Sequence, residues 1–293
     1  MPTLAMRLRP VLSAVRFAAL GLAWLLAPPL DAQPSASETA PEFDPVTFFV
    51  IGNVEYILLH ELAHLLIRDL DIPIIGPEEG AADYIATAVL IRADLFDTLR
   101  AARARQFLLA TANGLATAWE YGARDGDEIR YWDSHALTIQ RFYQVICLIY
   151  GSDPEEFAGM PAQVGMPQQR AAHCGAEYSR AIRSLQWLLA SFGRKPEDAP
   201  GAEVEVHYDA APTRTSRQLI AAIQASGIID NTVRRLREQF MLKEPFSIVF
   251  RACRERQAAW LPEQRELTFC YELLDSYYLL GRSDAARERM RSR

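Results

Sequence analysis

The sequence lacks the marks of several large protein classes. It has no basic excess, because 31 Lys and Arg residues stand against 37 Asp and Glu residues and the formal net charge is −6. An acidic chain without a basic patch argues against nucleic acid as a partner. It also has no G-x-S-x-G motif, no glycine-rich phosphate loop and no G-x-G-x-x-G. These absences remove the sequence support for a serine hydrolase, a P-loop enzyme and a dinucleotide-binding protein.

Long apolar runs are missing as well. No run of 18 or more apolar residues occurs in the body of the chain, so no internal membrane span is expected. Residues 1–32 differ: three arginines precede the ten-residue apolar stretch Phe17–Leu26, and Ala32 is a small residue before a cleavage point. This layout is typical of a secretory signal peptide, so we expect an exported protein, periplasmic or secreted. An uncleaved anchor helix is the alternative, although ten residues are short for a bilayer.

Cysteine is scarce. An even number of cysteines in an exported chain suggests disulfides. None belongs to a C-x-x-C motif, so neither a redox motif nor a cysteine zinc site is supported. Proximity favours Cys147–Cys174 and Cys253–Cys270, although four cysteines allow three pairings and free buried thiols remain the alternative.

Proline and glycine punctuation predicts an α+β fold that is predominantly helical. Residues 33–45 form a Pro/Ser/Ala-rich tail that we expect to be mobile, and residues 281–293 a solvated end. Between them we expect a helical domain at 46–193 and a small α/β region at 204–280. The helices expected in the first are 54–69, 78–96, 99–121, 134–150 and 171–192. The second is expected to contain strands at 204–209 and 246–253, one or two helices over 216–241, and a strand leading into a helix at 267–280.

The segment 57–67, ILLHELAHLLI, places H-E-x-x-H in an apolar helix. Residues four apart share a helix face, so His60 and His64 can bind one cation. Glu61 points toward the edge of the same site, where it could deprotonate a metal-bound water. Zn²⁺ suits two imidazoles and lowers the pKa of bound water toward about 7. A chance match, with two histidines satisfied in the core, is the alternative.

A catalytic zinc site needs a third protein ligand. Glu79 and Asp83 share a face of the next predicted helix, so Glu79 is the expected ligand and Asp83 the expected partner of a ligand's ring N–H. Glu78 would share its face with Ala82 and is not expected to contribute. Acidic residues are also favoured in a first helical turn by the helix dipole alone.

H-E-x-x-H followed by a helix with E-x-x-x-D resembles the gluzincin branch of zinc metallopeptidases. The wider chain is similar to a bacterial family catalogued as domain of unknown function 4344, whose members are inferred to be metallopeptidases from the motif. The similarity rests on LLHELAHLLI, PIIGPEEGAAD, DSHALTIQRFYQVICLIYG with the later Cys174, and ELTFCYELL. It covers most of residues 50–280. Gly80 departs from the family pattern, where an acidic residue is expected, without removing a proposed ligand.

The resemblance implies hydrolysis of a peptide or protein substrate, with Glu61 as the general base. The oxyanion needs a further donor, for which Tyr84, Tyr143, Arg141 and above all His135 are candidates. The rival hypothesis is a non-catalytic envelope protein that keeps a metal for stability or partner binding. The intact Glu61 and the count of three ligands favour the enzyme. Substrate preference and oligomeric state do not follow from the sequence.

The C-terminal FCYELLDSYYLL parallels the metal-binding segment, with Tyr271, Glu272 and Asp275 at the positions of its His, Glu and His. Two hypotheses follow. Residues 204–270 could supply the sheet that zincins place beside the active helix, or the C-terminal part could be a degenerate, metal-free repeat. Coincidence in a Leu-rich helix is the alternative to both.

Overall fold

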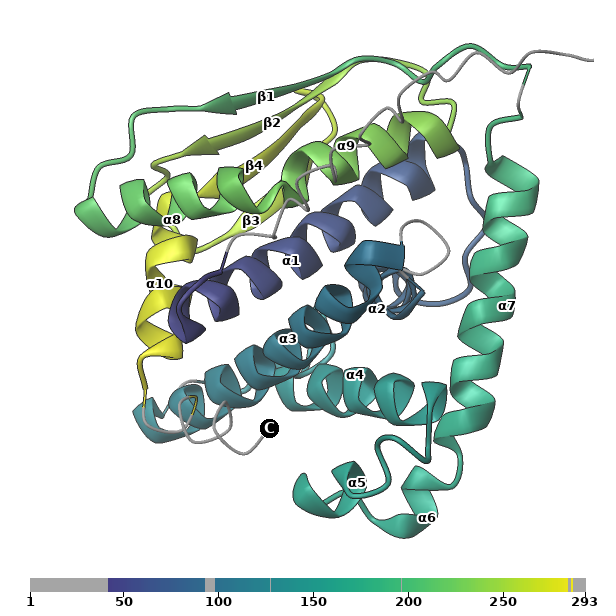
Figure 1. Ribbon diagram of the computed structural model, residues 1–293, viewed down its shortest axis with the longest axis vertical. Coiled ribbons are helices and arrows are strands. Elements are labelled where there is room, and N and C mark those ends of the chain that lie inside the picture. The colour runs from purple at the N-terminus through teal and green to yellow at the C-terminus, as the bar shows by residue number, and fades with distance from the viewer. Residues whose placement is uncertain (1–41, 93–97, 127, 196, 284–285, 287–293) are drawn as a thin grey trace, which may run out of the picture. The chain divides into compact units, whose positions relative to one another are not determined.

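The computed structural model describes residues 42–92, 98–126, 128–195, 197–283 and 286 (Figure 1). The predicted signal peptide and most of the predicted tail lie outside the described residues. Residues 40–293 belong to one compact unit. The helices are α1 (Pro45–Asp69), α2 (Glu78–Ile91), α3 (Thr98–Asp125), α4 (Thr138–Ser152), α5 (Met160–Gln163), α6 (Gln168–Ala171), α7 (Cys174–Phe192), α8 (Arg214–Ser226), α9 (Ile228–Gln239) and α10 (Tyr271–Gly281). The strands are β1 (Val204–Tyr208), β2 (Phe246–Arg251), β3 (Ala258–Leu261) and β4 (Glu266–Cys270).

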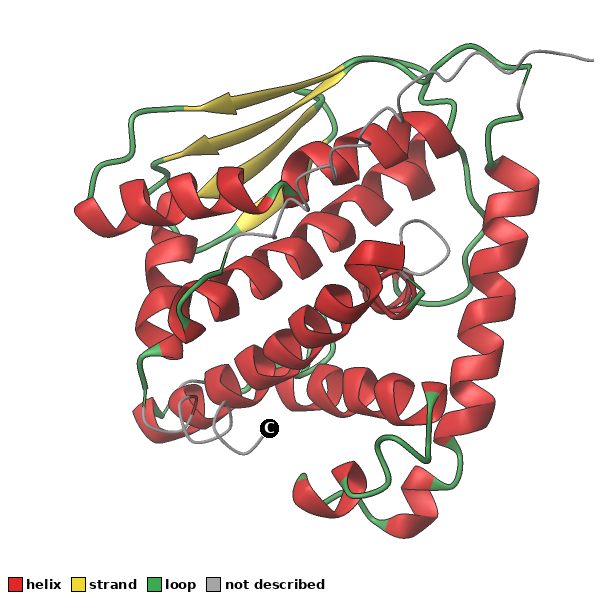
Figure 2. Ribbon diagram, in the orientation of Figure 1, coloured by secondary structure: helices red, strands yellow, loops and turns green. Residues whose placement is uncertain are grey.

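The predicted fold class is confirmed: the protein is predominantly helical, with one small sheet near its C-terminus (Figure 2). The strand order is β1-β2-β4-β3. β1, β2 and β4 are parallel, and β3 pairs antiparallel with β4 at the edge of the sheet. β1, β2 and β4 were expected from the sequence, whereas the four-residue β3 was not.

Helix α1 runs through the middle of the unit, between the sheet with α8 and α9 on one side and α2, α3 and α4 on the other (Figure 1). It begins nine residues before the predicted Val54, because Pro45 occupies the first turn and the Asp44 side chain accepts hydrogen bonds from the N–H groups of Val46 and Thr47. Its middle is apolar on nearly all sides and buried. α1 is also the one described helix long and apolar enough to span a membrane, but 67% of that window is buried inside the protein.

Helix α2 starts at the predicted residue, Glu78, and α3 covers the predicted third helix. The predicted start of the fourth helix at Ser134 is wrong. α4 begins at Thr138, because the Asp133 side chain accepts a hydrogen bond from the backbone N–H of His135 and holds that segment as a turn.

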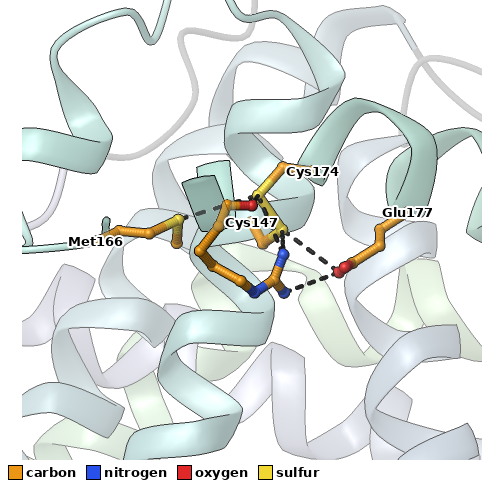
Figure 3. Close-up of a disulfide and its surroundings, with 5 residues drawn as sticks. Cys147, Met166, Cys174 and Glu177 are labelled. Atoms are coloured by element: carbon orange, nitrogen blue, oxygen red, sulfur yellow. Dashed lines mark hydrogen bonds and ion pairs between the residues drawn. A yellow bond between two sulfur atoms is a disulfide. The ribbon is translucent and has the colours of Figure 1, made fainter. Parts of the chain in front are cut away.

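Both disulfides have the pairing that sequence proximity favours. Cys147–Cys174 joins α4 to α7, beside Met166 and Glu177 (Figure 3). Cys253–Cys270 ties the loop before β3 to the end of β4. The second bridge therefore fixes the chain on both sides of the edge strand.

Candidate metal centre

Helix α1 brings His60 and His64 together one turn apart, and both are buried. Their Nε2 atoms lie 3.2 Å apart. Glu79, in the first turn of α2, places Oε2 3.1 Å from Nε2 of His60 and 3.3 Å from Nε2 of His64. These three residues form a group whose ligand atoms could hold one metal ion.

The spacing of these three atoms fits a zinc ion. Zn–N and Zn–O bonds of about 2.0–2.1 Å in a tetrahedron place neighbouring ligand atoms about 3.3 Å apart. The observed separations of 3.1, 3.2 and 3.3 Å are close to that value. Two imidazoles and one carboxylate are also the donor set of many catalytic zinc sites.

Each histidine is oriented by its own carboxylate. Nδ1 of His60 lies 2.9 Å from Oδ1 of Asp83, and Nδ1 of His64 lies 2.7 Å from Oε1 of Glu78. Because the Nδ1–H groups donate outward, both Nε2 atoms are directed at the common point where a metal would bind. Asp83 therefore occupies the position that the sequence predicted for it.

A charged partner holds each of these carboxylates in turn. Arg141 of α4 donates two hydrogen bonds to Asp83, of 2.8 and 2.7 Å, and the Tyr56 hydroxyl donates a third of 2.8 Å. Arg68 lies 3.3 Å from Glu78. The Asp83 pair is buried and the Glu78 pair is largely exposed, with side-chain exposures of 4% and 19% against 29% and 57%.

Sequence reasoning missed Glu78, because it considered only which residues share a face within α2. Both glutamates lie in the first turn, and both reach back to the histidines on α1. The signal that could have identified Glu78 is the pair of adjacent acids facing a pair of histidines, since each imidazole has a second nitrogen that needs a partner.

The charges of the site shift several pKa values. Burial alone would lower the pKa of His60, but its hydrogen bonds to Asp83 and Glu79 outweigh burial and raise the pKa to about 9. The hydrogen bond to His60 lowers the pKa of Glu79 to about 2. Burial would raise the pKa of Asp83, but its bonds to His60 and Arg141 hold it well below the usual range. Without a metal, His60 is therefore held as a cation between the carboxylates of Asp83 and Glu79.

Glu61 lies on the same turn of α1 and contacts the sheet. Its Oε2 accepts a hydrogen bond of 2.8 Å from the backbone N–H of Trp260 in β3. Burial raises the pKa of the Glu61 carboxyl above its ordinary value, although the nearby histidines oppose this. β3, which was not predicted, thus holds the residue predicted to be the general base.

His135 reaches the site from the loop before α4. Its Nε2 lies 2.8 Å from Oε2 of Glu79, its Nδ1 lies 3.2 Å from Oδ1 of Asp133, and its ring is stacked near that of His60 at 6.1 Å. The side chain is 45% exposed and lies outside the three-residue ligand group. It is thus on the open side of the centre.

The other suggested donors are engaged elsewhere. Tyr143 donates to the carbonyl of Val164, and Tyr84 lines a separate pocket beside α7. Arg141 is bound to Asp83.

A second cluster of ligand-type residues has a structural use. Cys253 and Cys270 form a disulfide, and Glu272 accepts the backbone N–H groups of Cys253 and Arg254. The Tyr271 hydroxyl donates to the carbonyl of Asp209. Tyr271 and Glu272, which stand at the positions of His60 and Glu61 in the parallel C-terminal segment, therefore hold loops in place.

A cleft of about 980 Å³ opens beside the metal centre. It is lined by the end of α3, the loop 128–137, the start of α4 and Arg256, and it includes His135 and Arg141. Its volume is large enough for several residues of a peptide.

Comparison with known proteins gives one family. Neither a curated protein nor a solved structure matches the chain. The family model DUF4344, described as "Putative metallopeptidase", matches residues 34–189 and 208–292, which include the whole metal centre and β3. The chain therefore belongs to this metallopeptidase-type family, DUF4344.

Proposed function

We propose that the protein is an exported, zinc-dependent peptidase of the gluzincin type. One observation carries the proposal: two Nε2 atoms and one carboxylate oxygen converge at tetrahedral spacing, with Glu61 on the adjacent face of the same helix turn. His60, His64 and Glu79 would hold the ion. When bound there, zinc supplies Lewis acidity that polarises a carbonyl and makes water more acidic.

Glu61 acts as the general base in this proposal. The Trp260 N–H fixes its Oε2, which leaves Oε1 for proton transfer. Glu61 accepts a proton from the attacking water and delivers it to the leaving amine nitrogen. Its raised pKa suits a group that must first take up a proton and then release it.

His135 is proposed as the donor to the oxyanion of the tetrahedral intermediate. It lies on the open side of the centre, where the scissile carbonyl would enter from the cleft. Its Nδ1 faces Asp133 and its Nε2 faces Glu79, so the ring lies between two carboxylates. In its doubly protonated form, His135 would donate Nδ1–H to Asp133 and could donate Nε2–H to the negatively charged oxygen.

The edge strand and the disulfides support the remaining parts of the proposal. β3 lies against the helix that carries the histidines, the position required if the C-terminal region supplies the zincin sheet. Two disulfides are compatible with export to an oxidising compartment. The non-catalytic alternative gains no support from the described residues, because a closed structural zinc site would use four protein ligands.

The test uses the chain without residues 1–32, the wild type beside Glu79→Ala, Glu61→Gln and His135→Gln. Zinc content is measured by atomic emission, and hydrolysis is measured with a quenched fluorescent peptide pool. We expect about one zinc per chain in the wild type, in Glu61→Gln and in His135→Gln, and loss of zinc in Glu79→Ala. Activity should fall about 10²–10⁴-fold in Glu61→Gln and about 10²-fold in His135→Gln.

His207→Gln is the matched control for the histidine variant. His207 is exposed on β1 and pairs only with Glu205 among the described residues, so its loss should change neither quantity. Full zinc retention by Glu79→Ala would disprove the ligand set. Peptide hydrolysis that survives Glu61→Gln would disprove the general base.

A further inference from the structure

The loop before β3 is held rigidly. The Cys253–Cys270 disulfide anchors its start, and the Glu272 carboxylate accepts hydrogen bonds from the N–H groups of Cys253 and Arg254. The carbonyl of Gln257 accepts the N–H of Cys270 at its end. These contacts fix the backbone from which the loop presents its side chains.

This loop presents Arg256 to the cleft. The side chain is exposed, lines the same cleft as His135, and forms no ion pair within the described part of the chain. The other cations of the cleft are engaged: Arg141 is bound to Asp83, and Arg130 lies 3.5 Å from Asp133. Arg256 is thus the guanidinium that can bind an incoming anion.

The acidic groups of the cleft do not cancel this charge. Asp133 is engaged by His135 and Arg130, and neither Asp133 nor Glu128 forms an ion pair with Arg256 among the described residues. Both belong to the loop 128–137, whereas Arg256 comes from the loop before β3. A guanidinium offers up to two parallel hydrogen bonds to a carboxylate, which gives geometric selectivity for that group.

We propose that Arg256 is a specificity-determining residue that binds a carboxylate of the peptide substrate. Arg256 lies four residues before Trp260, the residue of β3 whose N–H holds Glu61. The proposal rests on the peptidase function proposed above. The carboxylate could belong to an acidic side chain or to the free C-terminus of a short peptide. Both present the same chemistry to Arg256.

Binding is measured first, so that the result does not depend on catalysis. The probes are fluorescently labelled decapeptide pools with a fixed central Glu or a fixed central Gln, each with a free or an amidated C-terminus. They are titrated against zinc-loaded Glu61→Gln protein with and without Arg256→Gln. We expect about tenfold tighter binding of the pool that carries the recognised carboxylate, lost in Arg256→Gln. The central-Glu arm and the free-terminus arm distinguish the two sources of carboxylate.

Hydrolysis is then measured for the wild type and for Arg256→Gln and Arg256→Glu, all of which keep Glu61. The ratio of kcat/KM for the Glu and Gln pools, or for free and amidated termini, should exceed one and fall toward one in Arg256→Gln. It should invert in favour of a Lys pool in Arg256→Glu, and the preference should weaken at high salt. Arg254→Gln is the control, because Arg254 is exposed on the same loop but does not line the cleft.

The two proposals fail separately. Equal binding of all pools, or a preference that survives Arg256→Gln, would overturn the role of Arg256 whether or not peptides are cleaved. A carboxylate preference in binding with no hydrolysis by the zinc-loaded wild type would overturn the peptidase function and leave the anion site standing.

Discussion

Replacing Asp83 by Asn separates the stability of the metal centre from its affinity for metal. Asp83 accepts hydrogen bonds from His60, Tyr56 and Arg141, and its side chain is only 4% exposed. Asn keeps the shape but loses the charge, and its amide N–H₂ faces the guanidinium. Breaking a buried ion pair costs about 3–5 kcal/mol, because the remaining charge is left uncompensated. Since Asn retains one oxygen for His60, we expect the lower end, about 3 kcal/mol.

For a chain of this length, about 3 kcal/mol corresponds to a fall in Tm of roughly 6–12 °C. Loss of the carboxylate that orients a liganding histidine typically lowers metal affinity about 10–100-fold. Glu78→Gln is the matched comparison, because Glu78 orients the other histidine but belongs to a largely exposed pair. We expect Glu78→Gln to cost less than about 1 kcal/mol while still lowering zinc affinity about tenfold.

The assay is urea unfolding with EDTA present, so that bound zinc does not contribute to the measured stability. Zinc affinity is measured separately by competition with a chromophoric chelator. If Asp83→Asn and Glu78→Gln destabilise the metal-free protein equally, the distinction between a buried and an exposed pair is wrong. If neither changes zinc affinity, the orienting role of both carboxylates is wrong.

Three further outcomes are expected. Zinc uptake at pH 7 should release about one proton, because the pKa of His60 is raised to about 9 and its ring must lose a proton to bind metal. Zinc affinity should therefore rise from about pH 7 to 9 and then level off. The number of protons released is measured by calorimetry in buffers of different ionisation enthalpy, and a value near zero would contradict this expectation. Replacing Cys253 and Cys270 by Ser should lower the unfolding free energy by about 3 kcal/mol in denaturant titrations, and an unchanged midpoint would refute it. Arg265→Gln should cost about 1 kcal/mol in the same titrations through loss of its paired hydrogen bonds to Asp69, an effect that should be absent in an Asp69→Asn background.

The grouping of His60, His64 and Glu79 in the candidate metal centre could be predicted because it depends on local geometry. The i, i+4 spacing places His60 and His64 on one face, and the same spacing places Glu79 and Asp83 on one face of the next helix. When α1 and α2 pack against each other, these two faces meet, and the histidines of α1 contact the acidic residues of α2. The fold class followed from the same periodicities.

The partners of those ligands could not be predicted, because they come from distant parts of the chain. Arg141 lies 58 residues from Asp83, and Trp260 lies 199 residues from Glu61. β3 has only four residues, Ala258–Leu261, and its strand character comes from pairing with β4 rather than from its own sequence. His135 was placed at a helix start, whereas its side chain needs the turn that Asp133 stabilises.

The bond between Glu61 and Trp260 also orders events during synthesis. Helix α1, which carries the candidate ligands His60 and His64, is among the first described elements to leave the ribosome, and β3, which holds Glu61, is among the last. At about 5–20 residues per second, the interval between the two residues is roughly 10–40 s. Throughout that time α1 presents an apolar surface without its sheet, which makes it a target for chaperones. The nascent chain therefore carries His60 and His64 long before Trp260 can position Glu61, and on the proposed function hydrolysis would have to wait until the polypeptide is nearly complete.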